Sequence, residues 1–260
     1  MTVVLPAPAT VPARVLAWLV AAERLGELHL TLAPAAQWQP PSARNPWSDE
    51  TAERLTVLGW RDSAGKLERE VVASLTVLCR PVVEMFGWMT HAGATIGVLA
   101  ARIGKDAMLA VRTPDGRIGL SSIPAGRLAE RLVAQAPLIP PGPGKPLSVS
   151  PADLRSVNRA GRQLTSTGAI VRKAGPDARH TRQLLSQPGT GGGELWVATR
   201  DSAGRRHVIE RPLRYADIDN GRHQITVSGA AQVRLIPAGC AQLVTALNLA
   251  YRTLPVGART

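Results

Sequence analysis

The sequence predicts an α+β fold in which two similar halves share one central antiparallel sheet with helical bundles at its sides. Each half has the same order of predicted elements: helices, then a run of antiparallel strands, then one closing helix. The tetrapeptide Ile-Pro-Ala-Gly occurs twice, at 123–126 and 236–239, and each copy follows a hairpin pattern and opens the closing helix. A unit that is used twice predicts a duplicated domain with a pseudo-twofold core. We expect one domain made of an N-terminal half (1–136), a Pro- and Gly-rich linker (137–149) and a C-terminal half (150–260).

The first half begins with segments whose apolar residues recur at helical spacing. The predicted helices lie at 12–25, from Ser48 onward and at 66–79, with a short strand at 28–32 and a loop at 33–47 between the first two. The following strands are predicted at 82–90, 95–103, 107–112 and 117–122, and a helix at 124–135 closes the half. The turn Thr113-Pro114-Asp115-Gly116 is a strong signal, because Pro fixes φ and Gly accepts positive φ.

The second half repeats this order after the linker. Ser150 followed by Pro151 is a typical helix start, with Ser as the cap and Pro at the first helical position. The predicted helices lie at 151–166, 176–187 and 237–252. The predicted strands lie at 194–200, 206–212, 222–228 and 231–236, and the glycines at 189–193 are interpreted as a connector that precedes them.

No group of residues in the sequence has the spacing of a catalytic site, and we predict that the protein is not an enzyme. The five histidines are scattered without metal-ligand spacing, and no Gly-x-Ser-x-Gly elbow occurs. The segment 142–146 resembles a phosphate-binding loop, but it lacks the first Gly and the Ser or Thr that should follow Lys145. We therefore expect no metal and no cofactor.

The cysteines and the apolar runs indicate a cytoplasmic protein. Cys79 and Cys240 stand far apart in apolar helical contexts, which predicts free thiols in a reducing compartment. The longest strongly apolar run, at 15–22, is far shorter than the roughly 20 residues that cross a bilayer. Glu23 and Arg24 follow it directly, and no basic segment precedes it, so we expect neither a signal peptide nor membrane insertion.

The net charge of +12 is unevenly distributed along the chain. Residues 151–260 carry 16 basic and 7 acidic side chains, and Arg155, Arg159 and Arg162 share one face of a predicted helix. This basic patch is either a solvated face or a docking site for an acidic partner or nucleic acid. The segment 151–195 contains no aromatic residue, which argues against stacking on bases. Nucleic-acid binding through 151–182 is kept as the alternative function, although we do not expect a nucleic acid to be the partner.

A candidate protein-binding surface lies near the end of the first long strand. Alternation places Phe86 and Trp88 on one face of the sheet and Met85 and Met89 on the other. If only one face is core, the other exposes apolar side chains beside the turn at 91–94, as partner-binding surfaces do. The alternative is that helices cover both faces.

Several short patterns, in a fixed order along the whole chain, resemble the ESX secretion-associated EspG family of actinobacteria. The patterns of the first half are Leu25-Gly26-Glu27-Leu28, Leu58-Gly59-Trp60-Arg61-Asp62 with Gly65-Lys66-Leu67, and Leu78-Cys79-Arg80-Pro81. Those of the second half are Gly193-Glu194-Leu195-Trp196, Arg200-Asp201 with Gly204-Arg205, and Asp219-Asn220-Gly221-Arg222. No single pattern is decisive, so the resemblance rests on the ordered set.

The resemblance implies a function that the search for catalytic groups does not supply. EspG proteins are cytosolic, non-enzymatic chaperones of type VII secretion, which bind PE–PPE heterodimers at a hydrophobic tip and keep them soluble until export. This implies a PE–PPE heterodimer, or another ESX substrate, as the partner of this chain. A homodimer is left open.

The resemblance also implies where the partner is held, namely at the loop between the first two long strands and at the C-terminal helical parts. These map onto 88–95 and onto the helices near 176–187 and 237–252. The partner-binding residues so implied are Trp88, Met89, Thr90, His91, Ala92, Gly93, Leu184 and Leu185. The chain departs from the family in its short loop at 91–94 and in its strongly basic charge, which leaves room for a different substrate.

Overall fold

A computed structural model describes residues 4–34, 49–62, 64–150, 152–153, 175–227 and 232–255. The first half supplies the strands β1 (Ala9–Pro12), β2 (Val83–His91), β3 (Ala94–Ile103), β4 (Asp106–Arg112) and β5 (Arg117–Ser122). Its helices are α1 (Ala13–Ala22), α2 (Asp49–Val57), α3 (Arg69–Cys79) and α4 (Leu128–Val133). The strands β2 to β5 confirm the predicted strands to within one residue at each end.

The second half supplies the remaining strands and helices. Its strands are β6 (Leu147–Val149), β7 (Gly189–Arg200), β8 (Arg206–Val208), β9 (Leu213–Ile218), β10 (Gly221–Val227) and β11 (Val233–Pro237). Its described helices are α6 (Pro176–Leu185) and α7 (Cys240–Arg252). Of the helix predicted at 151–166, only residues 152–153 are described, so the basic patch of Arg155, Arg159 and Arg162 lies outside the described residues.

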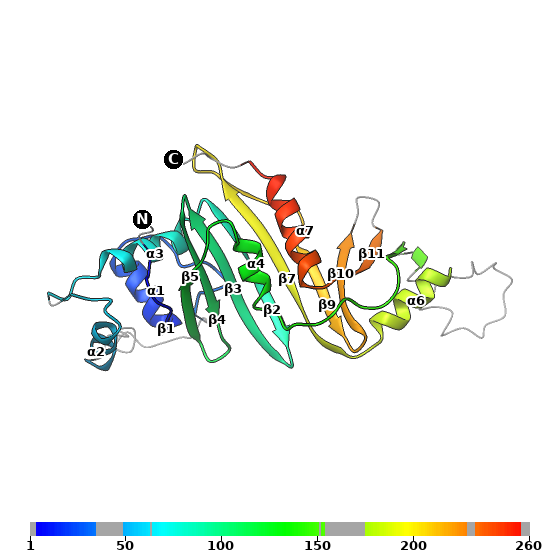
Figure 1. Ribbon diagram of the computed structural model, residues 1–260, viewed down its shortest axis with the longest axis horizontal. Helices are drawn as coiled ribbons and strands as arrows, with labels where there is room; N and C mark the ends of the chain where they lie inside the picture. The colour runs from blue at the N-terminus through cyan, green and yellow to red at the C-terminus, as the bar shows by residue number, and fades with distance from the viewer. Residues whose placement is uncertain are drawn as a thin grey trace.

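All strands belong to one large sheet, which confirms the predicted α+β class and the sheet shared by both halves. The strand order is β1-β5-β4-β3-β2-β7-β9-β10-β11-β6, with β8 paired to β7 beside this path (Figure 1). The halves meet where β2 pairs with β7 in antiparallel register, with Phe86 opposite Trp196. A Cβ at Gly87 would lie 2.0 Å from the carbonyl oxygen of Glu194, so this close approach of two strands requires glycine.

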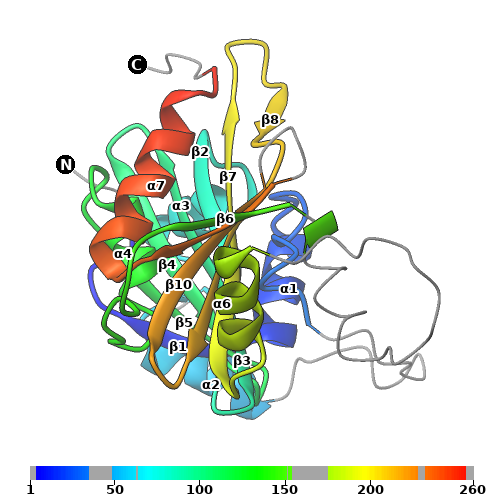
Figure 2. The ribbon, with the colours of Figure 1, turned by 90° about the vertical axis from the view of Figure 1, so that its right-hand side faces the viewer.

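Helices cover both faces of the sheet, and each face has its own apolar core (Figure 2). On one face α1 and α3 pack over a cluster that includes Leu16 and Phe86. On the other face α4 and α7 pack over a cluster that includes Met85, Leu132 and Leu243. The middle of β2 is therefore covered on both sides, which decides between the two readings of its alternating apolar residues. The helices are few, rather than the bundles that the sequence predicts.

The predicted strand at 28–32 is absent from the described structure. The backbone turns here instead, because the N–H groups of Leu32 and Ala33 both donate to the carbonyl of His29, at 2.8 and 3.0 Å. The turn is pressed against the sheet: a Cβ at Gly97 of β3 would lie 2.1 Å from the carbonyl oxygen of Thr31. The alternating Leu and polar residues at 28–32 therefore belong to a turn that packs on β3, and not to a strand.

Two predictions in the second half are wrong in detail. The glycines at 189–193 are not a connector but the first part of β7, paired with β2 on one side and with β9 on the other. The strand predicted at 206–212 ends at Val208, and β9 was not predicted at all. Hydrogen bonds to two neighbouring strands override the low strand propensity of glycine. A local sequence pattern does not reveal these distant neighbours.

The linker is bound to the second half by a buried ion pair. Both Arg222 and Asp217 are fully buried, with Arg222 Nε donating to Asp217 Oδ1 at 2.6 Å and Nη2 to Oδ2 at 3.0 Å. The same Nη2 donates to the carbonyl of Pro137 at 3.0 Å, and the backbone N–H of Arg222 donates to that of Pro140 at 2.9 Å. The Pro- and Gly-rich linker is therefore held in a fixed position against the second half.

The two Ile-Pro-Ala-Gly copies stand in equivalent places. One lies between β5 and α4, and the other spans the end of β11 and the start of α7. The helices begin only at Leu128 and Cys240, because the residues before them form a turn and a cap rather than the first helical turn. Helix α4 is accordingly shorter than the predicted 124–135.

Candidate partner-binding site

The predicted site centres on the turn between β2 and β3 at one end of the sheet. His91 pairs with Ala94, and the two residues between them have positive φ, +48° at Ala92 and +80° at Gly93. Positive φ at both central residues is the geometry that joins twisted strands most directly. The hydroxyl groups of Thr90 and Thr95 lie 2.8 Å apart across the strands and brace the turn. The site therefore presents a rigid tip rather than a long loop.

Segments that are distant in sequence meet this turn. The N–H of Ala92 donates to the carbonyl of Thr190 at 3.0 Å, next to the point where α6 leads into β7. On the far side of β7, Gly189 pairs with Ile218 at the end of β9. The β2–β3 turn, the start of β7 and the β9–β10 turn thus lie at the same end of the sheet (Figure 1). The structure brings together the loop at 88–95 and the end of the helix at 176–187, as the sequence analysis expects.

The predicted contact residues differ in how far they reach the surface. His91, Ala92 and Gly93 are exposed, while Trp88 and Thr90 are half-buried. Met89 is only 3% exposed and faces the core beneath α4 and α7, so it is not available to a partner, and a charge placed there would disrupt that core.

The predicted leucines of α6 give a similar correction. Leu184 is 5% exposed, because it packs with Leu147 and Leu235 in a small apolar cluster of the second half. The side chain of Leu185 lies outside the part of the chain that is described. What α6 offers a partner is instead its polar surface, including the exposed Arg179 and Gln183.

An apolar patch with a charged border lies beside the turn. Trp88 stands opposite Gly97, and over Gly97 passes the backbone that carries Leu30, which is 53% exposed. On its other side Trp88 faces Glu194, which accepts a hydrogen bond from the Arg214 Nε at 2.8 Å. We take Leu30 and Trp88, with the Glu194–Arg214 pair at their border, as the candidate apolar patch, because the backbone next to Leu30 crosses β3 directly beside Trp88.

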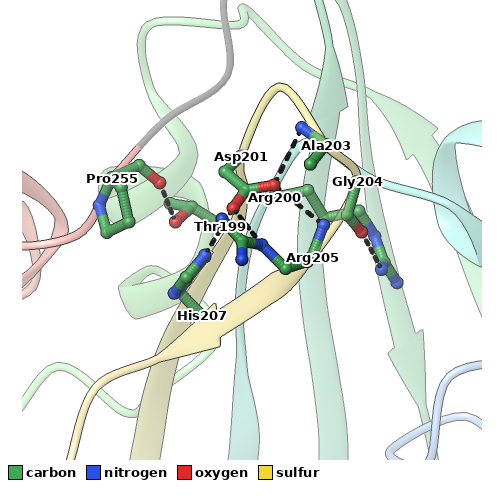
Figure 3. Close-up of polar contacts among 8 residues, drawn as sticks. All are labelled: Thr199, Arg200, Asp201, Ala203, Gly204, Arg205, His207 and Pro255. Atoms are coloured by element: carbon green, nitrogen blue, oxygen red, sulfur yellow. Dashed lines mark hydrogen bonds and ion pairs between the residues drawn. The ribbon is translucent and has the colours of Figure 1, made fainter.

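The last helix does not reach this patch. Leu243 and Leu247 of α7 are buried against the sheet, and its outer face exposes Leu249. The chain after α7 is held at the opposite end of β7, where Thr199 Oγ1 donates to the carbonyl of Pro255 at 2.6 Å (Figure 3). The expected contribution of 237–252 to the site is therefore not supported by the placement of α7.

The same far end of β7 holds a cluster of polar contacts at the turn into β8 (Figure 3). Asp201 Oδ1 accepts the backbone N–H groups of Ala203 and Arg205, and Oδ2 lies 2.9 Å from both Arg205 Nε and His207 Nε2. The hydrogen bonds from His207 and from the N–H of Arg205 lower the pKa of Asp201. All acceptors of this carboxylate are thus used within the turn, which makes it a structural rather than a reactive group.

Among the described residues, no three His, Cys, Asp or Glu side chains are arranged to hold a metal ion. No described helix has the length and apolar character needed to cross a membrane.

A family model matches residues 12–248, which is most of the chain, and its description is the EspG family. The chain belongs to the EspG family. The resemblance drawn from the ordered short patterns is thereby confirmed. No curated protein matches the chain in sequence.

A solved structure shares the fold of this EspG family member over nearly its full length. It is the type VII secretion system chaperone EspG5 of Mycobacterium tuberculosis, in complex with a PE25-PPE41 dimer. The TM-score is 0.70, the sequence identity is 16%, and the match covers 97% of this chain and 99% of that chain. At this identity the likeness establishes the fold.

The family resemblance led to the β2–β3 turn but not to Leu30, Glu194 or Arg214. Leu30 was missed because its alternating neighbours suggested a strand with a buried face. Glu194 and Arg214 become neighbours only through the pairing of β7 with β9, and β9 was not predicted. No local signal in the sequence could have joined them.

Proposed function

We propose that this EspG family member is a chaperone of type VII secretion, which binds a PE–PPE-type substrate dimer and keeps it soluble until export. The observation that carries the proposal is the family match over residues 12–248. The fold shared with EspG5, which was solved in complex with a PE25-PPE41 dimer, supports it. A cytosolic location and a purely binding, non-enzymatic role belong to the same proposal.

The proposed partner site is the apolar patch of Leu30 and Trp88 together with the tip at 90–93. An exposed leucine beside a half-buried tryptophan offers apolar area to a hydrophobic partner tip, and desolvating it favours association. The Glu194–Arg214 pair at the border stays accessible to water. Met89 and Leu184 are buried and are not proposed as contacts, whereas Leu185 stays a proposed contact.

The rigid turn suits a chaperone that must recognise one tip. Because the pairing of His91 with Ala94 closes the turn and the N–H of Ala92 donates to Thr190 of β7, little conformational entropy is lost when a partner docks. Occupying the partner's apolar tip also excludes other apolar surfaces from it, which is how a binding protein keeps a substrate soluble.

Other partners are weaker proposals. A different ESX substrate remains compatible with the short turn and with the basic charge, and a homodimer remains open. The family match does not favour nucleic acid, and Arg155, Arg159 and Arg162, which suggested it, lie outside the described residues.

We further propose that the two halves are copies of one unit, with boundaries at 1–136, 137–149 and 150–260. Outward from the central β2–β7 pair, the strand order is β3, β4, β5, β1 in one direction and β9, β10, β11, β6 in the other. This order, and the equivalent places of the two Ile-Pro-Ala-Gly copies, support a pseudo-twofold axis between β2 and β7.

Co-expression with a PE–PPE pair from the same genome tests the chaperone role and the site together. We expect the pair to become soluble and to co-elute with the chain in size-exclusion chromatography. Leu30→Asp should weaken the complex by about tenfold or more, because it places a charge in the apolar patch. The matched control is Leu249→Asp, since Leu249 is 64% exposed on α7 away from the patch.

Two results would count against the proposal. If the chain never changes the solubility of any PE–PPE pair from its own genome, the chaperone role is wrong. If the complex forms but Leu30→Asp and Leu249→Asp bind equally well, the role stands and the patch is not the contact surface.

A further inference from the structure

A small cavity of about 210 Å³ lies in the second half, between the linker, β10, β11 and α6. Its apolar floor is the buried cluster of Leu147, Leu184 and Leu235. A cavity of about 150 Å³ lined by apolar side chains is already large enough to bind benzene. The space therefore accepts a group the size of one side chain.

The one polar group of the buried lining is His223, which is 3% exposed. Neither ring nitrogen has a hydrogen-bond partner among the described residues. The ring is seated against the linker backbone, because a Cβ at Gly142 would lie 1.9 Å from its Cε1. A buried imidazole without hydrogen bonds lowers stability, and a ligand that accepts its N–H would recover part of that loss.

Charged side chains form the rim. Lys145 comes from the linker, and Asp177 and His180 come from the first turns of α6, all three being exposed. Burial lowers the pKa of His223, helped by the charge of His180 and opposed by the nearby backbone of Gly221, so the neutral imidazole keeps one N–H to donate. The lining thus combines an apolar floor, one buried donor and a rim with more basic than acidic groups.

We propose that this cavity binds a small monocarboxylate, whose short apolar chain rests on the three leucines and whose carboxylate accepts a hydrogen bond from His223. Lys145 at the rim adds a favourable charge. Asp177 opposes a second negative charge, and the apolar floor disfavours a fully hydrated ion such as phosphate. The cavity shares α6 with the proposed partner surface, but its ligand is a small molecule and its test requires no partner.

The direct test is a titration of the full chain with sodium butyrate, followed through the histidine Cε1–H signals in NMR spectra. Butyramide, the neutral compound of the same shape, is the control ligand. We expect saturable shifts of the His223 and His180 signals with butyrate, at the millimolar affinity of so small a ligand, and weaker binding of butyramide, which lacks the charge that Lys145 favours. The signal of His207, in the distant turn of Figure 3, should not move.

Substitutions make the test independent of signal assignment. Lys145→Gln should weaken butyrate binding about fivefold, whereas Lys105→Gln, at the exposed turn between β3 and β4, should leave it unchanged. His223→Gln should abolish binding. If this buried variant does not fold, the comparison of Lys145→Gln with Lys105→Gln decides the outcome. The proposal is overturned if butyrate causes no saturable shift, which would mean an ordered water only. It is equally overturned if butyramide binds as well as butyrate, or if Lys145→Gln has no effect.

Discussion

At the scale of single residues, His29 is one group through which pH acts on the stability of this fold. Its Nδ1 accepts the N–H of Thr31 at 3.3 Å and lies 2.9 Å from the Thr31 hydroxyl, so the ring carries its proton on Nε2. That nitrogen lies 3.6 Å from Oε2 of the buried Glu84, whose other oxygen pairs with Arg206. Burial and the charge of Arg206 lower the pKa of His29 from 6.5 to about 4.

The sign of the resulting pH dependence follows from this shift. The unfolded chain binds a proton at His29 near pH 6.5, whereas the folded chain does so only near pH 4. The contribution of neutral His29 to the free energy of unfolding is therefore fully present above pH 6.5. It is lost as the pH falls to 4, by up to about 3 kcal/mol. Urea unfolding of the chain and of His29→Gln should give free energies whose difference shrinks across this range. His207→Gln is the control, and parallel curves for the chain and His29→Gln would contradict the assignment.

Turns are the residue-scale features that the sequence predicts best. Asp62-Ser-Ala-Gly-Lys66 and Asp201-Ser-Ala-Gly-Arg205 are nearly identical, and both fold alike: the aspartate Oδ1 accepts the N–H two and four residues later at 2.8–3.0 Å. The glycines have φ of +80° and +79°. Such turns depend on neighbours in the sequence alone, and for that reason the turn at 113–116 was predicted correctly. Leu30, whose exposure depends on contact with β3, was not.

At the scale of elements, β7 and the linker show where local patterns fail. The glycines at the start of β7 form a strand because β2 and β9 lie so close on either side of them. A Cβ at Gly191 would lie 2.4 Å from the carbonyl oxygen of Thr90. The proline-rich linker is fixed because Arg222 reaches its carbonyls from β10. Both depend on partners far away in the sequence. The strands β2 to β5 were predicted well because short turns alone join them.

The buried pair between β9 and β10 should be far more costly to break than an exposed one. Arg222→Met leaves the Asp217 carboxylate buried without its partner, and we expect a loss of about 3–5 kcal/mol in urea unfolding. It also frees the linker, so proteolysis within 137–147 should become faster. Arg214→Met, which breaks the partly exposed pair with Glu194, should cost less than about 1 kcal/mol. Equal losses in the two variants would contradict this account of the linker.

At the scale of the whole molecule, the sheet explains how a chain with so few helices can present one rigid binding end. The central β2–β7 pair joins the two halves, and the same two strands lead to the β2–β3 turn and to the end of α6. The sequence analysis predicted this shared sheet and, through the family resemblance, the turn. It could not predict which side chains border the patch, since Leu30, Trp88 and Glu194 meet only in the assembled sheet.

The central claim is that the chain holds a secretion substrate through apolar contact, and one measurement tests it most directly. The tagged protein is recovered from its own host and washed at about 0.5 M salt, at which the Debye length is only several ångströms and exposed charge contacts are screened. Our account predicts a PE–PPE pair retained in stoichiometric amount, because apolar contacts survive this wash. Nucleic acid released by the salt, with no retained protein partner, would contradict it.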